Sequence, residues 1–254
     1  MKNQHERKKI IEYSLAALLG CIAANILFSF LPEFWANLLI GKVGIEFILT
    51  FQDIMWAFFF VGLIQVRDRN NDIKKLGSYK EKHYLSDSFE SIIDSDVLTE
   101  IIRSTKTEAK DKMGILPYMI LQISLQFRTN KSIALTSDFL SKQLELFLHG
   151  VELRYNKLKY IIWLIPSLGF MGTVYGIGLA VSKLGEGSLD DPSLLTNMAG
   201  SLGIAFNTTL LALVLSVILQ YLTQHFEAKE EILINDFGKY ILDNLINKLV
   251  EKRY

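Results

Sequence analysis

Residues 198–222 read MAGSLGIAFNTTLLALVLSVILQYL, an apolar stretch long enough to cross the hydrocarbon core of a bilayer as one helix. About 20 mostly apolar residues are needed for such a helix, and three more windows of the chain meet this requirement. They run from Ile10 to Leu31, from about Gly44 to Val66, and from Tyr160 to Leu184. The sequence therefore predicts an all-α, polytopic membrane protein with four transmembrane helices.

The composition agrees with a membrane protein and excludes several other classes. Half of the 254 residues are hydrophobic and only 21% are charged. The 27 basic residues balance the 27 acidic ones, so no net charge would draw the chain to nucleic acid. The single cysteine, Cys21, cannot form a disulfide within the chain. The first apolar window is also longer than the core of a signal peptide.

The basic residues predict the orientation of the four helices. Of the 27 lysines and arginines, 25 lie before the first window, between the second and third windows, or after the fourth. The other two connections hold only Lys42 and Lys183. Because basic residues accumulate in cytoplasmic segments, both termini and the middle region are expected to be cytoplasmic. Core helices of a soluble protein would show no such alternation of charge.

Apolar residues at three- and four-residue spacing predict long cytoplasmic helices that continue the spans. One helix is expected from about Ser137 through the third window to Leu184, roughly 70 Å long. The expected organisation has four parts. They are an N-terminal tail with transmembrane helices one and two (1–66), a cytoplasmic helical domain (67–159), a channel core of transmembrane helices three and four (160–222) and a cytoplasmic C-terminal helix (223–254).

Small residues in the third and fourth windows predict close helix packing. Spacing of this kind lets two helix backbones approach each other within a membrane. The residues concerned are Gly169, Gly172, Gly176, Ala180 and Gly203. The glycines do not form a phosphate-binding loop, because no Gly-Lys-Ser/Thr follows them. Pro166 removes one backbone donor near the start of the third window, which predicts a local kink and a candidate hinge.

Three polar residues, Asn207, Thr208 and Thr209, interrupt the fourth window, and Thr173 lies in the third. Polar groups inside a bilayer usually face protein or water. A threonine hydroxyl can bond back to a carbonyl of its own helix, which would be a purely structural role. Alternatively, two helices that carry hydroxyls and pack through glycines can line a narrow path for water, for an ion or for a carboxylate of another chain. The sequence leaves both roles open.

Asp53 lies about midway along the second window, where a carboxylate is costly. It is a candidate intramembrane acid, or else a hydrogen-bonded acid that helps the peripheral helices pack. The four histidines show no spacing typical of metal ligands, so no metal site is expected. No nucleophile or acid/base pair has a recognisable local signature, so the sequence does not predict an enzyme.

Two stretches, PSLGFMGTVYGIGLA at 166–180 and GSLGIAFNTTLLALVLSVIL at 200–219, resemble the MotA/TolQ/ExbB proton channel family. The resemblance implies a ring of five subunits in the bacterial inner membrane around two copies of a single-span partner of the MotB/TolR/ExbD kind. The partner's membrane aspartate would carry the ion. Thr173 and Thr208 match the family's channel-lining threonines, and Pro166 matches its proline at the cytoplasmic start of the third helix.

The chain also departs from part of this family. Gly203 stands where ExbB and TolQ proteins often have a glutamate, so that residue's role does not carry over. Four spans with a cytoplasmic N-terminus instead resemble the MotA type and the membrane subunit of the Zorya anti-phage system. The resemblance implies the pore-forming stator subunit of a rotary motor driven by protons or sodium ions, with no cofactor other than the transported ion. A self-contained ion channel or transporter, or a non-conducting scaffold, are the alternatives.

Overall fold

The computed structural model describes residues 2–40, 50–82, 84–85, 93–110, 114–186 and 192–250. These residues form helices and connections, with one isolated parallel bridge between Ile93 and Leu249, so the predicted all-α fold is confirmed. The elements are α1 (Lys2–Ser29), α2 (Glu33–Ile40), α3 (Phe51–Lys80), α4 (Ser95–Glu108), α5 (Ile115–Asn130), α6 (Ile133–Glu186), α7 (Pro192–Asn244) and the 3-10 helix η1 (Ile246–Lys248).

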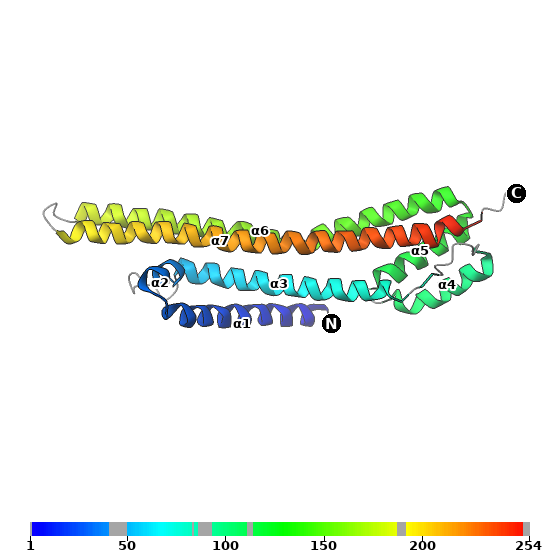
Figure 1. Ribbon diagram of the computed structural model, residues 1–254, viewed down its shortest axis with the longest axis horizontal. Coiled ribbons are helices and arrows are strands. Elements are labelled where there is room, and N and C mark those ends of the chain that lie inside the picture. The colour runs from blue at the N-terminus through cyan, green and yellow to red at the C-terminus, as the bar shows by residue number, and fades with distance from the viewer. Residues whose placement is uncertain are drawn as a thin grey trace. The chain divides into compact units, whose positions relative to one another are not determined.

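Two of the helices, α6 and α7, are much longer than a bilayer is thick, with 54 and 53 residues (Figure 1). The prediction of a single helix from Ser137 to Leu184 is therefore confirmed. Pro166 lies inside α6 without ending it. Pro192 is the first residue of α7, a position where the missing N–H would have had no partner within the helix.

Both α6 and α7 are also apolar enough to cross a membrane. Their most apolar 18-residue windows have mean hydropathies of 1.6 and 2.2, and only 33% and 39% of these windows is buried within the chain. The described residues contain a shorter apolar helical stretch at Tyr13–Ser29. The second predicted window began at Gly44, and its part before Thr50 falls outside the described residues. Two of the four predicted spans thus pass this criterion, and the first two remain predictions.

The chain divides into two compact units, to which α3, α6 and α7 each contribute a part. The first unit comprises residues 1–67 and 156–224, and the second comprises 68–155 and 225–254. The boundaries predicted from the sequence come after residues 66, 159 and 222.

In the first unit, α1 lies beside α3, and α3 lies against α7 (Figure 1). Glycines permit both contacts. A methyl group built on Gly20 of α1 would lie 2.5 Å from the ring of Phe60, and one built on Gly62 of α3 would lie 2.5 Å from Leu219 of α7. Both distances are shorter than van der Waals contact, so a larger residue would push the helices apart.

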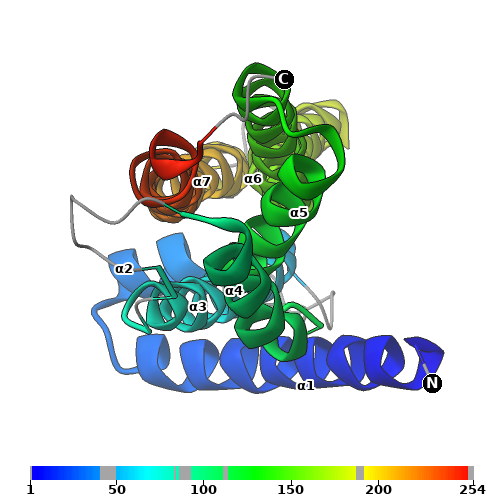
Figure 2. The ribbon, with the colours of Figure 1, turned by 90° about the vertical axis from the view of Figure 1, so that its right-hand side faces the viewer.

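In the second unit, the ends of the long helices pack around α4 and α5, which lie against each other (Figure 2). The buried core draws on α3 through Leu76, on α5 through Met119, Ile120 and Ile123, and on α7 through Phe237. These side chains are at most 2% exposed. The C-terminal part of the chain also joins this core through the bridge between Ile93 and Leu249, where the Ile93 N–H donates to the Lys248 carbonyl at 3.0 Å.

Candidate functional site: a threonine cluster between two long helices

The candidate site lies in the first unit, where glycines of α6 bring its backbone against α7. A methyl group built on Gly169 would lie 2.4 Å from an atom of α7, and one built on Gly172 would lie 2.6 Å from the Thr208 hydroxyl oxygen. At Gly176 the methyl group would lie 2.8 Å from the Ser201 carbonyl oxygen, which is backbone and cannot turn away. The two helices can therefore approach this closely only because these positions lack a Cβ.

Three threonine hydroxyls gather where the helices meet. Thr173 of α6 donates toward the Gly169 carbonyl at 3.2 Å or the Ala205 carbonyl at 3.1 Å, and it also bonds to the Thr209 hydroxyl. Thr208 lies 3.0 Å from the Ala205 carbonyl and 3.4 Å from the Gly169 carbonyl. Thr209 lies 3.3 Å from the Gly169 carbonyl. We call the three hydroxyls and these two carbonyl oxygens the threonine cluster.

The threonine cluster is rich in acceptors. It contains five oxygen atoms, but each hydroxyl carries a single hydrogen, so lone pairs outnumber the available donors. Hydroxyl and carbonyl oxygens of this kind can hold water, a hydrated proton or an alkali cation. The same hydroxyls bond to their own helix and to the neighbouring one. The two roles that the sequence left open are therefore both compatible with this arrangement.

The remaining predicted residues lie at different places around this cluster. Ala180 is 2% exposed, within the packed part of α6. Asn207 is partly exposed and does not enter the contacts of the threonine cluster. A methyl group built on Gly203 would meet no atom within 4 Å, so Gly203 makes no close helix contact within the chain, and its role in helix packing stays a prediction. Gly203 lies on a different face of α7 from the residues that meet α6. Pro166 precedes Gly169 by about one turn of α6, and its role as a hinge stays a prediction.

Asp53 does not lie in the middle of a helix, because α3 begins at Phe51. Its backbone N–H donates to the Thr50 hydroxyl at 3.2 Å, and its carboxylate accepts the Thr50 N–H at 3.0 Å. This reciprocal pair is a capping box, which satisfies donors at the start of a helix. The Asn25 amide of α1 donates to the other carboxylate oxygen at 2.7 Å. The geometry therefore corresponds to the hydrogen-bonded acid that helps peripheral helices pack.

Sequence reasoning did not single out Gln52, which follows Phe51 in the first turn of α3. Its side chain is 2% exposed, and its amide nitrogen Nε2 has no hydrogen-bond partner among the described residues. A lone glutamine near an apolar window carries no signal in the sequence. Only the helix packing shows that it is buried.

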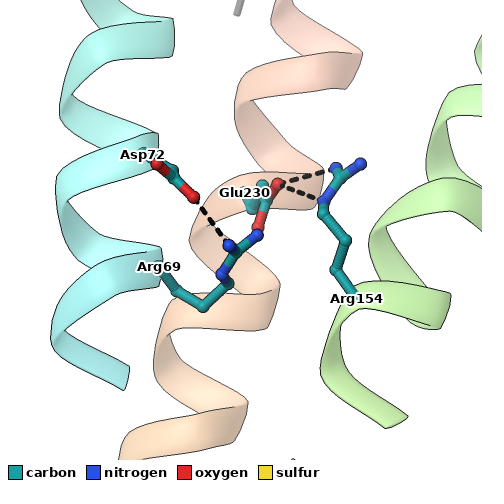
Figure 3. Close-up of polar contacts among 4 residues, drawn as sticks. All are labelled: Arg69, Asp72, Arg154 and Glu230. Atoms are coloured by element: carbon teal, nitrogen blue, oxygen red, sulfur yellow. Dashed lines mark hydrogen bonds and ion pairs between the residues drawn. The ribbon is translucent and has the colours of Figure 1, made fainter. Parts of the chain in front are cut away.

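The sequence also gave no indication of an ion pair in the second unit, shown in Figure 3. Arg154 of α6 donates from Nε and Nη2 to one oxygen of Glu230 of α7, at 3.0 and 2.7 Å. Glu230 is 1% exposed, and it lies 76 positions from Arg154 in the sequence. The nearby Arg69 pairs with Asp72 on α3 at 2.7 Å. Burial and the negative charge of Glu230 raise the pKa of Tyr155, which keeps that phenol neutral.

No group of three or more His, Cys, Asp or Glu side chains that could hold a metal ion occurs in the described part of the chain.

The threonine cluster lies in a segment that matches a known protein family. The profile of the MotA/TolQ/ExbB proton channel family matches residues 97–239, which include all of α6 and most of α7. The chain belongs to this family. Neither the curated proteins nor the solved structures gave a match.

Membership of the MotA/TolQ/ExbB family assigns the chain to a family of channel proteins of the membrane, not to an enzyme family. The matched residues contain the glycines of α6 and the whole threonine cluster. They also contain Arg154 and Glu230 of the second unit.

Proposed function

We propose that this protein is the pore-forming stator subunit of a rotary membrane motor driven by protons or sodium ions. The threonine cluster carries the proposal. It gathers five oxygens at one level of two helices that are long and apolar enough to span a membrane. Three adjacent hydroxyls in an apolar span supply the oxygens that an ion path needs to replace water. Family membership supports the same conclusion.

The proposed topology has four spans in the bacterial inner membrane, with both termini in the cytoplasm. The distribution of lysine and arginine supports this orientation. Its consequence is that the threonine cluster lies within the bilayer, while the second unit lies in the cytoplasm.

The proposed assembly is a ring of five copies around two copies of a single-span partner of the MotB/TolR/ExbD kind. An aspartate on the partner would carry the ion past Thr173 and Thr208. Loading and release of the ion change the charge of that aspartate, and with it the partner's affinity for each subunit. One elementary charge moved through 100 mV releases about 2.3 kcal/mol, so several ions per cycle could drive rotation against a modest load.

The first test is the native mass of the detergent-purified complex after expression with its genomic neighbours. Five copies of the chain with two copies of a single-span protein are expected. A monomer or a dimer without a companion chain would contradict the stator assignment. Ion flux by the chain alone would then support a self-contained channel. Such a channel would have to use Asp53, whose carboxylate already accepts hydrogen bonds from Asn25 and Thr50.

The second test replaces hydroxyls while keeping the shape of the side chain. Thr173→Val and Thr208→Val are each expected to reduce ion flux through the reconstituted complex by at least tenfold. The matched control is Thr223→Val, because Thr223 lies on the same helix as Thr208 and is equally buried, but outside the cluster. Wild-type flux in Thr173→Val and Thr208→Val would exclude these hydroxyls from the ion path. No flux even with the partner, together with tolerance of both substitutions, would favour a non-conducting scaffold in which the threonines only pack.

A further inference from the structure

Gln52 lies on the face of α3 that packs toward α7. Met55, Phe59 and Gly62 share this face at helical spacing, and each is buried. Gly62 contacts Leu219 of α7 directly. Gln52 is therefore one turn beyond Met55 on the packed side of the helix, and its 2% exposure agrees with that position.

Two contacts fix the level of Gln52 along the membrane-spanning helices. The first is the contact between Gly62 of α3 and Leu219 of α7, two helices that run in the same direction. Gln52 lies ten residues before Gly62, and Thr209 lies ten residues before Leu219, so each is about 15 Å from this contact along its helix. Independently, the ring of Phe51 lies 5.8 Å from that of Tyr175, two residues beyond Thr173 on α6. Along the helix axes, both contacts place Gln52 at the level of the threonine cluster to within about one turn.

The chemistry of the two groups is complementary. The amide nitrogen of Gln52 offers two hydrogens and finds no acceptor among the described residues, which is unfavourable for a buried donor. The threonine cluster has more lone pairs than hydrogens. A buried water molecule needs two to four polar partners, and this donor together with the hydroxyls provides them.

We propose that Gln52 and the threonine cluster bind a common water molecule, which makes Gln52 a further residue of the ion path. The role of Gln52 in the ion path rests on the proposed channel function, whereas the binding of the water molecule does not. The amide of Gln52 donates to the water, and the water donates to the oxygens of the threonine cluster. This arrangement keeps the cluster hydrated from the side of α3.

The water site is tested first, without any need for conduction or for the partner. Replacing Cys21 by serine gives a chain without thiols, since Cys21 is the only cysteine. Gln52→Cys is then compared with Met55→Cys, which is buried on the same face one turn away. Membranes are exposed to Ag⁺, which reacts with thiols that water reaches, and unreacted thiols are labelled with a fluorescent maleimide after denaturation.

Ag⁺ is expected to block the thiol of Gln52→Cys at least ten times faster than that of Met55→Cys. Equal rates would overturn the proposal whether or not the complex conducts. If the complex fails to conduct although Ag⁺ reaches the thiol of Gln52→Cys, the water site stands and the channel function fails.

The role in conduction is tested with Gln52→Met, which keeps an unbranched side chain of similar length without the amide. Gln65→Met on the same helix is the matched control, because Gln65 lies closer to the end of the span and away from the cluster. We expect at least a tenfold loss of flux in Gln52→Met and less than a twofold change in Gln65→Met. Wild-type flux in a correctly assembled Gln52→Met complex would exclude Gln52 from the ion path.

Discussion

Substitution of Gly176 by alanine tests whether the approach of α6 to α7 builds the threonine cluster. The new methyl group would lie 2.8 Å from both the Ala205 nitrogen and the Ser201 carbonyl oxygen. Carbon atoms pack best at about 3.5–4.0 Å, so the two helices must separate by roughly 0.7 Å. Both neighbours are backbone atoms, and no rotamer change can relieve the clash.

The magnitude follows from two opposing terms. Overpacking of a tight contact costs about 1–3 kcal/mol. Alanine is favoured over glycine within a helix by about 1 kcal/mol. Gly178→Ala isolates the second term, because a methyl group there would meet no atom within 4 Å. The free energy of unfolding should therefore differ by about 1–3 kcal/mol between the two variants, with Gly176→Ala the less stable.

Thermal unfolding of the purified protein in detergent measures this difference. One kcal/mol corresponds to about 2–4 °C for a chain near this size, so Gly176→Ala should unfold several degrees below Gly178→Ala. Gly203→Ala provides a second control on α7, since that position is also open within the chain. Equal unfolding temperatures for Gly176→Ala and both controls would refute the reasoning that the glycines set the helix spacing.

Three further predictions concern other contacts. Arg154→Ala should cost about 3–5 kcal/mol of unfolding free energy, because it leaves the buried carboxylate of Glu230 without its partner. Lys142→Ala, which removes one member of an exposed pair, should leave the unfolding free energy nearly unchanged, and chemical denaturation compares the two variants. The Tyr84 hydroxyl and the Lys82 ammonium lower the pKa of Glu108, so the stability from this contact is present above the ordinary glutamate pKa of about 4.3 and is lost as the pH falls below it. Glu108→Gln should therefore flatten the acid side of the stability profile, and an unchanged profile would contradict this reasoning. Thr50→Val removes the cap of α3 and should lower the unfolding free energy by about 1 kcal/mol, measured against wild type by thermal unfolding.

Local rules were sufficient to predict the helical architecture and much of the candidate site. Apolar spacing without turn residues predicted the single long helix that became α6, because helix formation depends mainly on neighbouring positions. The small-residue spacing of Gly169, Gly172 and Gly176 indicated the side on which a second helix could approach, and the structure places α7 there. Thr173 and Thr208 could be named as candidates because hydroxyls are rare in apolar spans.

The sequence by itself thus determined the helices, the predicted spans and the residues able to line an ion path, since each follows from the periodicity and polarity of one segment. Only the tertiary structure decided which faces meet. It buried Gln52 while leaving Gly203 open, and it joined Arg154 to Glu230 across 76 positions. It also placed Asp53 at a helix start, where it bonds to Asn25 of another helix. Burial and hydrogen bonding between distant segments depend on how helices pack, and a pattern within one segment does not contain that information.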